Sequence, residues 1–580
     1  MAFRWQYLPS VPRTCRPDGA VNKTSRLRIA PARRHVRRKN ARSKIWSRPR
    51  RGDTLVGCCN EDMSPGILSG FSNFAKTTDD LSSLKSLASQ TFWYGASSIA
   101  ARFLSYLLTP YLTAIMTGVD YGEMSIMYAA IPFLTVIFTY GMETAFFRFM
   151  QKEQYKGQVY STSCLSIIIS TAMLALIMFA GRDGIASLLT IKNHPEYFTI
   201  SILIISIDTL STLPFAKLRF EGRPMKYAAI RIAGILINIG LVILFLSVIP
   251  AFKKANPHHP ISIFYREDAS VEYYLIANLI SSAATFLLLS RTFFSFSWKF
   301  DFRLWKEMMA YSLPLVIVGF GGVINETFDR IMLGWWSPAL TPDAKKLDVG
   351  IYSACYKLSL LITLFVQAFR MGAEPFFFKQ AEVGNAQKTY ARVMKFFVIT
   401  VCVMFLVVVL YLEVWKEFIR NPVMWQGLKV VPVLLLANMF LGIYYNLSIW
   451  YKLSNRTMAG AYITVIGAAI TLLINYFFVP HFSYVACAWA TCICYATMMI
   501  ISFIWGQKEY PVPYAWKKLV AYIVIVVLLY FIQRLFYFIV PNKLASMAFG
   551  TILLLGYITF ILKVERKEFQ KLPVIGKFIK

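Results

Sequence analysis

Charged side chains interrupt several long apolar stretches of this sequence. Arg102, Asp208, Glu326, Asp329 and Arg330 each lie within a run of mostly hydrophobic residues. If these runs cross a membrane, each charge at the bilayer centre costs at least about 2.5 kcal/mol, so it should face a water-filled cavity or a partner of opposite charge. The chemistry that such residues offer is the binding of an ion or of a charged solute.

The polar residues of the first apolar stretch fall on one helical face. Ser98, Arg102 and Thr109 are spaced by four and seven residues, and residues so spaced share a face of an α-helix. We expect this face to point towards the interior of a helix bundle. Arg102 is a strong binding candidate, because its own helix offers no acid within a turn to neutralise it.

A later stretch carries acid and base together. Glu326 and Arg330 are four residues apart, with Asp329 alongside, so the acid and the base can neutralise one another on one face. They form either a structural ion pair or part of a binding site, and both interpretations stay open. Asp208 lacks a neighbouring base on its own helix, so it could bind a cation, as could Glu326 with Asp329.

Further candidates lie towards the ends of the expected helices. Gln367, Arg370 and Glu374 share one face, while Glu143 ends another helix and Arg219 lies near the end of a third. Arg219, with its basic neighbours, could hold an anionic head group. The alternative is that both glutamates are solvated loop residues, and that Arg219 only sets the orientation of the chain in the membrane.

The elements that position these residues must be membrane-spanning helices. Of 580 residues, 57% are hydrophobic and 16% charged, which excludes an ordinary water-soluble protein. Apolar runs of about twenty residues recur, each long enough to span the hydrocarbon core. We therefore predict an all-α, polytopic membrane protein of about fourteen transmembrane helices. The net charge of +31 lies mainly in loops and termini, where it sets topology rather than binding nucleic acid. We expect neither a metal site nor a disulfide framework.

The chain also contains an internal repeat. A shift of 228 positions (348 minus 120) aligns DYGEMSIMY from Asp120 with DVGIYSACY from Asp348, and places Arg102 on Arg330. With three further residues inserted, GMETAFF falls on GAEPFFF, which gives G-x-E-x-x-F-F twice. Because six spans separate the copies, the two halves should be parallel repeats. We predict two six-helix lobes with a binding cavity between them, plus two C-terminal helices.

These patterns divide the chain into five parts. They are a basic disordered segment (1–84), an N-terminal lobe with helices 1 to 6 (85–292), a C-terminal lobe with helices 7 to 12 (293–506), helices 13 and 14 (507–563) and a basic cytoplasmic tail (564–580). Residues 1–62 fit an organellar presequence or a tail that binds nucleic acid or anionic lipid, but we favour translation from Met63. The basic loops place both termini in the cytoplasm.

Two segments resemble the Wzx or RfbX type of polysaccharide flippase, within the multidrug/oligosaccharidyl-lipid/polysaccharide transporter superfamily. They are SLASQTFWYGASSIAARFLSYLLTPYLTAIMTGVDYGEMSIMYA and its echo YSLPLVIVGFGGVINETFDRIMLGWWSP. The resemblance implies a secondary transporter, not an enzyme, in the bacterial inner membrane. Such a protein moves undecaprenyl-diphosphate-linked oligosaccharide, the repeat unit of O-antigen, capsule or exopolysaccharide, from the cytoplasmic to the periplasmic leaflet by alternating access.

This resemblance gives the candidate residues roles. Arg102, Arg330 and Arg370 suit the diphosphate, while hydroxyl and amide groups at Ser98, Thr109 and Gln367 suit sugars. No cofactor is expected beyond coupling to Na⁺ or H⁺, felt at Asp208 or at Glu326 and Asp329. The implied partners are the lipid-linked oligosaccharide, the bilayer and glycan polymerase machinery.

Other functions share this architecture. Multidrug or cation antiporters and peptidoglycan-precursor flippases belong to the same superfamily, although several arginines in a cavity argue against a cationic drug. A membrane-embedded glycan polymerase or glycosyltransferase would also be hydrophobic and basic. It would need a positioned catalytic base or a sizeable external loop, neither of which the sequence indicates.

Overall fold

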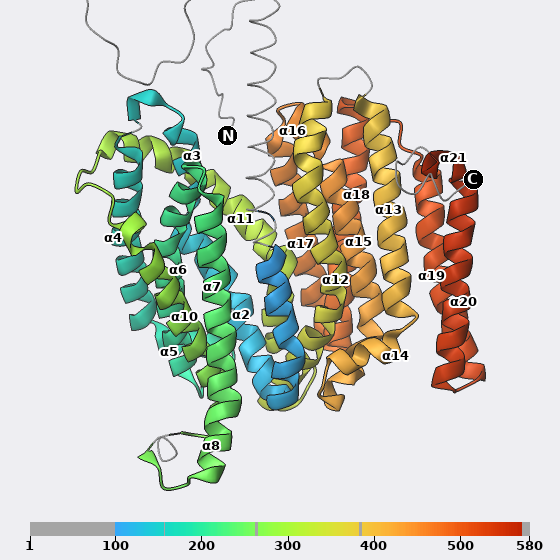
Figure 1. The fold of residues 1–580 in the computed structure, drawn as a ribbon, viewed down its shortest axis with the longest axis horizontal. Coiled ribbons are helices and arrows are strands. Elements are labelled where there is room, and N and C mark those ends of the chain that lie inside the picture. Colours follow the sequence, from blue (N-terminus) through green and yellow to red (C-terminus); the bar gives the residue numbers. More distant parts are fainter. Residues whose placement is uncertain (1–94, 96–98, 156, 261–264, 382–385, 571–580) are drawn as a thin grey trace, which may run out of the picture. The chain divides into compact units, whose positions relative to one another are not determined.

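The computed structural model describes residues 95, 99–155, 157–260, 265–381 and 386–570 (Figure 1). All regular secondary structure among these residues is helical. Thirteen of the described helices are long and apolar enough to cross a membrane, and a shorter apolar helix covers Ile99–Ile115. The prediction of an all-helical, polytopic membrane protein is therefore confirmed. The expected N-terminal segment 1–84 lies outside the described residues.

The first lobe contains six long helical segments. They are Ile99–Ile115, α2 (Gly118–Thr139), α4 (Val159–Ala180), α6 (Pro195–Phe220), α7 (Pro224–Ile243) with its continuation through a π-helical turn into α8 (Ile249–Ala255), and α10 (Ser270–Phe293). Two short helices, α3 (Met142–Met150) and α5 (Arg182–Leu188), form part of the connections.

The second lobe has six corresponding segments. They are α11 (Phe302–Trp336), α12 (Pro342–Gln380), α13 (Ala386–Val409), α15 (Val431–Leu447) with the preceding 3-10 helix η4 (Pro422–Val430) and the following α16 (Ile449–Leu453), α17 (Thr457–Phe482) and α18 (Tyr484–Glu509). The short helix α14 (Leu412–Trp415) follows α13. A final hairpin consists of α19 (Trp516–Ile539) and α20 (Lys543–Val564), after which comes α21 (Arg566–Phe569).

Polar caps extend α11 and α12 beyond the apolar runs from which we predicted them. The apolar runs themselves begin near residues 308 and 349. The side chain of Asp301 accepts a hydrogen bond from the backbone N–H of Leu304 and starts α11, while Thr341 does the same for Ala344 and starts α12. Hydropathy identifies the part of a helix that lies in lipid, whereas caps set its physical end.

The two copies of the repeat meet where α2 crosses α12. A Cβ atom on Gly122 would lie 1.9 Å from the carbonyl oxygen of Lys346, and one on Gly350 would lie 2.2 Å from the carbonyl oxygen of Gly118. The shift of 228 positions converts Gly122 into Gly350 and Gly118 into Lys346, so the two contacts are equivalent under it. A reciprocal contact of this kind is what a two-fold axis between matched lobes produces.

The repeat aspartates also play equivalent parts within their lobes. Asp120 accepts a hydrogen bond from Ser270, the first residue of α10, at 3.2 Å. Asp348 accepts one from Ser483, which directly precedes α18, at 2.6 Å. In each lobe the start of the second helix is therefore tied to the start of the sixth, which explains the aspartate of the shared motif.

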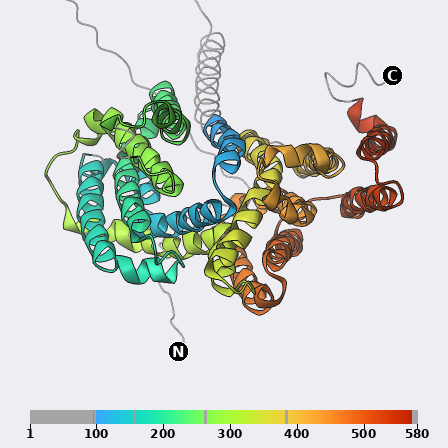
Figure 2. The same ribbon diagram turned by 90° about the horizontal axis from the view of Figure 1, so that it is seen from below.

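The α19–α20 hairpin is tied to the second lobe through α13 and the residues that follow it. Figure 2 views the helices end on and shows α19 and α20 as neighbours. At one end, the amide of Gln533 donates to the carbonyl oxygen of Leu410 at 2.7 Å. At the other, the carboxylate of Glu565 accepts hydrogen bonds from Lys395 at 2.8 Å and from Tyr522 at 2.7 Å.

Candidate functional site

A cavity of about 410 Å³ lies between helices of the two lobes. The first lobe contributes the Ile99–Ile115 helix and α7, and the second contributes α11 and α12. The charged groups in its wall are Arg102, Arg231, Glu326 and Lys357, that is, three cations and one carboxylate. Polar and apolar residues complete the lining: Ala101, Ser105, Tyr106, Ile235, Leu360, Thr363, Leu364 and Gln367. The excess of positive charge favours an anionic occupant.

Arg102 lines this cavity as a solvent-exposed side chain. It forms no ion pair with any residue that the structure describes. No described acid neutralises its charge, and the binding of a solute by Arg102 stays a prediction. Gln367, another predicted residue, also lies in the cavity wall.

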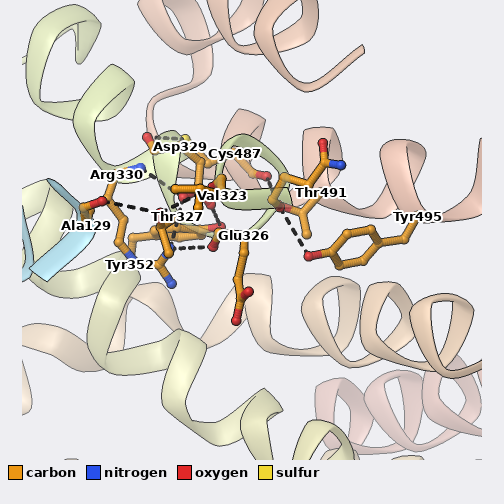
Figure 3. Close-up of polar contacts among 11 residues, drawn as sticks. Ala129, Val323, Glu326, Thr327, Asp329, Arg330, Tyr352, Cys487, Thr491 and Tyr495 are labelled. Carbon is orange, nitrogen blue, oxygen red and sulfur yellow. Dashed lines mark hydrogen bonds and ion pairs between the residues drawn. The ribbon is translucent and has the colours of Figure 1, made fainter. Parts of the chain in front are cut away.

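Arg330, which the repeat aligns with Arg102, is held by its own lobe (Figure 3). Its Nη1 atom lies 3.0 Å from the Oδ1 atom of Asp329 and donates to the carbonyl oxygen of Glu326 at 2.9 Å. The other carboxylate oxygen of Asp329 accepts a hydrogen bond from the hydroxyl of Tyr352 at 2.5 Å. The guanidinium group also lies 4.4 Å from the ring centroid of Tyr356. The Nη1 group of Arg330 is thus engaged by the protein.

Of the two acids near Arg330 in the sequence, the structure pairs Asp329 with it, and not Glu326. Only the backbone oxygen of Glu326 accepts a hydrogen bond from Arg330. Asp329 is 3% exposed, and a buried carboxylate needs a counter-charge far more than an exposed one does. The side chain of Glu326 extends away from this cluster in Figure 3 and lines the cavity.

Two charged residues of the cavity wall, Arg231 and Lys357, were not predicted from the sequence to lie in a binding cavity. Arg231 is one of the basic neighbours of Arg219 in the sequence, but it lies about 10 Å inside α7, seven residues from the start of that helix. The second residue, Lys357, was not predicted as part of a site. Lys357 directly precedes the apolar run LSLLITLF. Because a charge facing lipid is costly, a lysine at this place is expected to face the interior of the bundle.

Asp208 lies on α6 and does not line the cavity itself, but it is close to Arg231, which does. Its carboxylate is close to the hydroxyl of Ser282 and to the charge of Arg231. A cation at Asp208 would therefore compete with a resident arginine. Thr109 is buried, with 2% of its surface exposed, and is not part of the cavity lining. Ser98 lies outside the described residues.

The two glutamates of the repeat, Glu143 and Glu374, form ion pairs. Each lies near the C-terminal end of α2 or α12, whereas the glycine crossing lies near the N-terminal ends of these helices. Glu143 pairs with Arg219 at the end of α6. Glu374 pairs with Arg370 at 3.0 Å and with Lys452, in α16, at 2.6 Å. Each lobe therefore ties its repeat glutamate to a cation near the end of its fourth long helical segment. Glu143, Arg219, Arg370 and Glu374, which we predicted as ligand-binding candidates, are therefore paired within the protein.

A buried ion pair joins the lobes at the end of the helices that carries α8 and α14, the lower end in Figure 1. The Nζ atom of Lys346 lies 2.6 Å from Oε1 of Glu123, and both side chains are 6% exposed. This pair sits beside the crossing of α2 and α12. Lys357 is eleven residues further along α12, about 16 Å at the rise of an α-helix. The lobes are therefore closed on one side of the cavity.

Comparison with known proteins identifies relatives of this architecture. A family profile described as "Polysaccharide biosynthesis protein" matches residues 87–381. No curated protein matches the sequence. Among solved structures, "Lipid II flippase MurJ, inward closed conformation" is similar with a TM-score of 0.59 and 14% identity, over 81% of this chain and 98% of that one.

Transporters of the MATE type are similar as well. An outward-facing multidrug resistance MATE family transporter of the MOP superfamily matches with a TM-score of 0.50 and 13% identity. A MATE protein in the straight conformation gives 0.51 and 12%. Each match covers 73% of this chain and 95% of the other. At these identities the similarity shows a shared fold.

Proposed function

The chain belongs to the polysaccharide biosynthesis protein family, whose profile covers just over half of it, and we propose that it carries a lipid-linked oligosaccharide across the membrane. The proposed cargo is an undecaprenyl-diphosphate-linked repeat unit of a surface polysaccharide. Its proposed route is from the cytoplasmic to the periplasmic leaflet of a bacterial inner membrane, by alternating access.

The observation that carries this proposal is the cationic cavity between the lobes. Arg102, Arg231 and Lys357 offer positive charge that a diphosphate requires, and arginine can bind phosphate oxygens with two parallel hydrogen bonds. Gln367 and Ser105 add amide and hydroxyl groups of the kind that bind sugars. The same wall would repel a cationic drug. The cavity therefore favours an anionic cargo over the cationic drugs that a multidrug antiporter would carry.

The contacts between the lobes support alternating access. The Glu123–Lys346 pair and the glycine crossing close one side of the cavity, and moving the lobes apart there would separate both. We propose from the basic loops that the opposite end, which carries α3, α16 and α21, is cytoplasmic. With this orientation the closed side is periplasmic, and the cavity loads from the cytoplasm.

Cation coupling is a further part of the proposal. Asp329 is fully engaged by Arg330 and Tyr352, so it is a poor site for Na⁺ or H⁺. Glu326, whose carboxylate lines the cavity, remains available, as does Asp208 if it releases Arg231. We therefore assign coupling to Glu326 first.

Complementation tests the proposed function. Strains lacking either a surface-polysaccharide flippase or the peptidoglycan-precursor flippase would receive the wild-type chain, Arg102→Gln or Lys517→Gln, a matched exposed cation on α19 far from the cavity. We expect the wild type and Lys517→Gln to restore surface polysaccharide, and Arg102→Gln to fail at equal protein level. Rescue of only the strain that lacks the peptidoglycan-precursor flippase would favour the second candidate function, a precursor flippase. The similarity of the fold to that of a lipid II flippase makes this the second candidate.

The closed side can be tested separately. Glu123→Ala leaves Lys346 buried without its counter-charge, which destabilises the closed arrangement. A cysteine at Ser105, in the cavity wall, should then react faster with a membrane-impermeant thiol reagent added from the periplasmic side. Asp120→Ala is the matched control, because it removes a hydrogen bond within one lobe. Equal labelling rates in the Glu123→Ala variant and its parent would rule out this pair as the closing contact.

A further inference from the structure

A second cavity, of about 510 Å³, lies between the second lobe and the α19–α20 hairpin. Its walls come from the end of α13, from α14 and η4, and from the facing ends of α19 and α20. Lys429 of η4 and Arg534 of α19 both line it. It is remote in sequence from the residues of the cavity between the lobes and shares none of them.

The charge of this cavity is positive. Lys429 and Arg534 are both exposed, and neither forms an ion pair with a residue that the structure describes. Each lies instead near an aromatic ring, Lys429 at 5.0 Å from the centroid of Tyr484 and Arg534 at 6.0 Å from that of Tyr537. The acid in the wall, Glu413, is engaged by other cations: Lys416 at 2.5 Å and Lys543 at 3.9 Å. An occupant must therefore supply negative charge.

The surroundings of Arg534 are apolar and face outward. On the same helix, Phe531 is 60% exposed, Leu535 61% and Phe538 85%. In a membrane protein such side chains lie against acyl chains. Arg534 is five residues from the end of α19, about 8 Å along the helix, which is close to the depth of the head groups. A ligand here would meet cations with its head and an apolar surface with its tail.

Two hydrogen bonds join the elements that form the walls of this cavity. The amide of Gln533 donates to the carbonyl oxygen of Leu410, across the gap between α19 and the end of α13. Tyr411 and Thr551 share a hydrogen bond of 2.7 Å, which joins α20 to the same segment. The space is therefore enclosed by a fixed frame, and is not only a separation between a lobe and a loose hairpin.

We propose that this cavity binds the phosphate of a lipid, with Lys429 and Arg534 as its counter-charges. The chemistry is shared by two sources, an anionic phospholipid of the bilayer and a polyprenyl diphosphate. The first source does not depend on the proposed transport function, whereas the second rests on it. With the orientation proposed above, the cavity faces the outer leaflet, where a translocated lipid would be released.

Native mass spectrometry of the full chain in detergent tests this site. Phosphatidylglycerol, the diacylglycerol with the same acyl chains, and undecaprenyl diphosphate would each be titrated into the wild type, Lys429→Gln/Arg534→Gln, and the control Lys508→Gln/Lys517→Gln. The control removes two cations near the opposite ends of the helices. Each of these proteins would also be made with Arg102→Gln, which removes one of the three cations of the cavity between the lobes.

We expect phosphatidylglycerol to bind the wild type and the control at least fivefold more tightly than it binds Lys429→Gln/Arg534→Gln, and diacylglycerol to bind all three weakly and equally. Arg534→Lys should retain most of the affinity. Undecaprenyl diphosphate competing at this site in the Arg102→Gln background would identify the cargo as the source, and phosphatidylglycerol alone would identify the bilayer. Equal affinities of the wild type and the double variant for both phosphorylated lipids, with all proteins folded, would overturn the proposal. The assay measures no transport, so its failure is distinct from failure of the proposed function.

Discussion

Arg102 and Arg330 occupy the same position in the two copies of the repeat, but their surroundings differ. Arg330 is bound by Asp329 and stacks near Tyr356, and Asp329 is held in turn by Tyr352. The positions that match Asp329 and Tyr352 in the first copy are Ala101 and Met124, since 329 minus 228 is 101 and 352 minus 228 is 124. Ala101 cannot pair with a guanidinium group as Asp329 does, and Met124 has no hydroxyl that could donate to such a carboxylate as Tyr352 does.

The difference shows how one duplicated arginine can acquire two roles. In the second lobe, an added carboxylate and phenol convert the arginine into a structural element. In the first lobe, alanine and methionine leave the charge to the cavity. Arg330 is therefore expected to matter for stability and Arg102 for ligand binding.

The largest effect is expected on removing the partner of Arg330. Asp329→Ala leaves a buried guanidinium without its counter-charge, which should lower the free energy of unfolding by about 3–5 kcal/mol. Thermal unfolding in detergent would measure it. Glu326→Ala is the control, because that carboxylate is exposed to the cavity, and its effect on stability should stay within about 0.5 kcal/mol. Similar stability of the two variants would refute the structural role of the Asp329–Arg330 pair.

A large effect on transport, without loss of stability, is expected from Arg102→Gln. A hydrogen bond to a charged group contributes about 1.5–3 kcal/mol, so flipping of a lipid diphosphate in proteoliposomes should slow by about tenfold to a hundredfold. The melting temperature should match that of the wild type. A destabilised variant would instead show that Arg102 has a structural partner of its own.

A smaller but more specific effect is expected from Ala101→Asp, which gives the first copy the acid of the second. The new carboxylate can pair with Arg102 as Asp329 pairs with Arg330. Transport should fall by about fivefold to tenfold, because a salt bridge competes with the solute for one cation. Ala101→Asn has similar size without the charge and should retain most of the rate. If both variants transport equally, charge at this position is not what separates the two copies.

The smallest effect concerns the attachment of the α19–α20 hairpin, which has no counterpart in the repeat. Burial raises the pKa of Glu565, but hydrogen bonds from Lys395 and Tyr522 and the charge of Lys518 outweigh it, so the pKa lies below its ordinary value of 4.5. The folded state therefore gains stability above about pH 4.5, and that gain is lost as the pH falls through the depressed pKa.

Glu565→Gln should lower the melting temperature by about 1–2 °C at pH 7 and remove part of its decline between pH 5 and pH 3. Differential scanning fluorimetry across that range would measure both. Glu417→Gln, an exposed carboxylate, is the control. An unchanged pH profile would show that Glu565 does not anchor the hairpin.

The sequence predicted the architecture well because the features that determine it are local or periodic. Apolar length specifies the spans, and the D-x-G-x-x-S-x-x-Y motif predicts matched lobes whose glycines meet at Gly122 and Gly350. Which charges pair with each other was not predictable. Glu326 and Asp329 lie on adjacent parts of one helix, and burial by the neighbouring helices decides which of them takes Arg330. Lys357 was missed because a single lysine leaves no periodic signal.

The most direct test of the account is the affinity of the purified protein for undecaprenyl diphosphate, measured by titration for the wild type, Arg102→Gln and Ala101→Asp, all in the Lys429→Gln/Arg534→Gln background. We predict that affinity falls at least tenfold in Arg102→Gln and severalfold in Ala101→Asp, while undecaprenol, which lacks the diphosphate, binds all three proteins weakly and equally. Undiminished affinity of a folded Arg102→Gln protein for undecaprenyl diphosphate would contradict the claim that the unpaired arginine of the first copy binds the cargo.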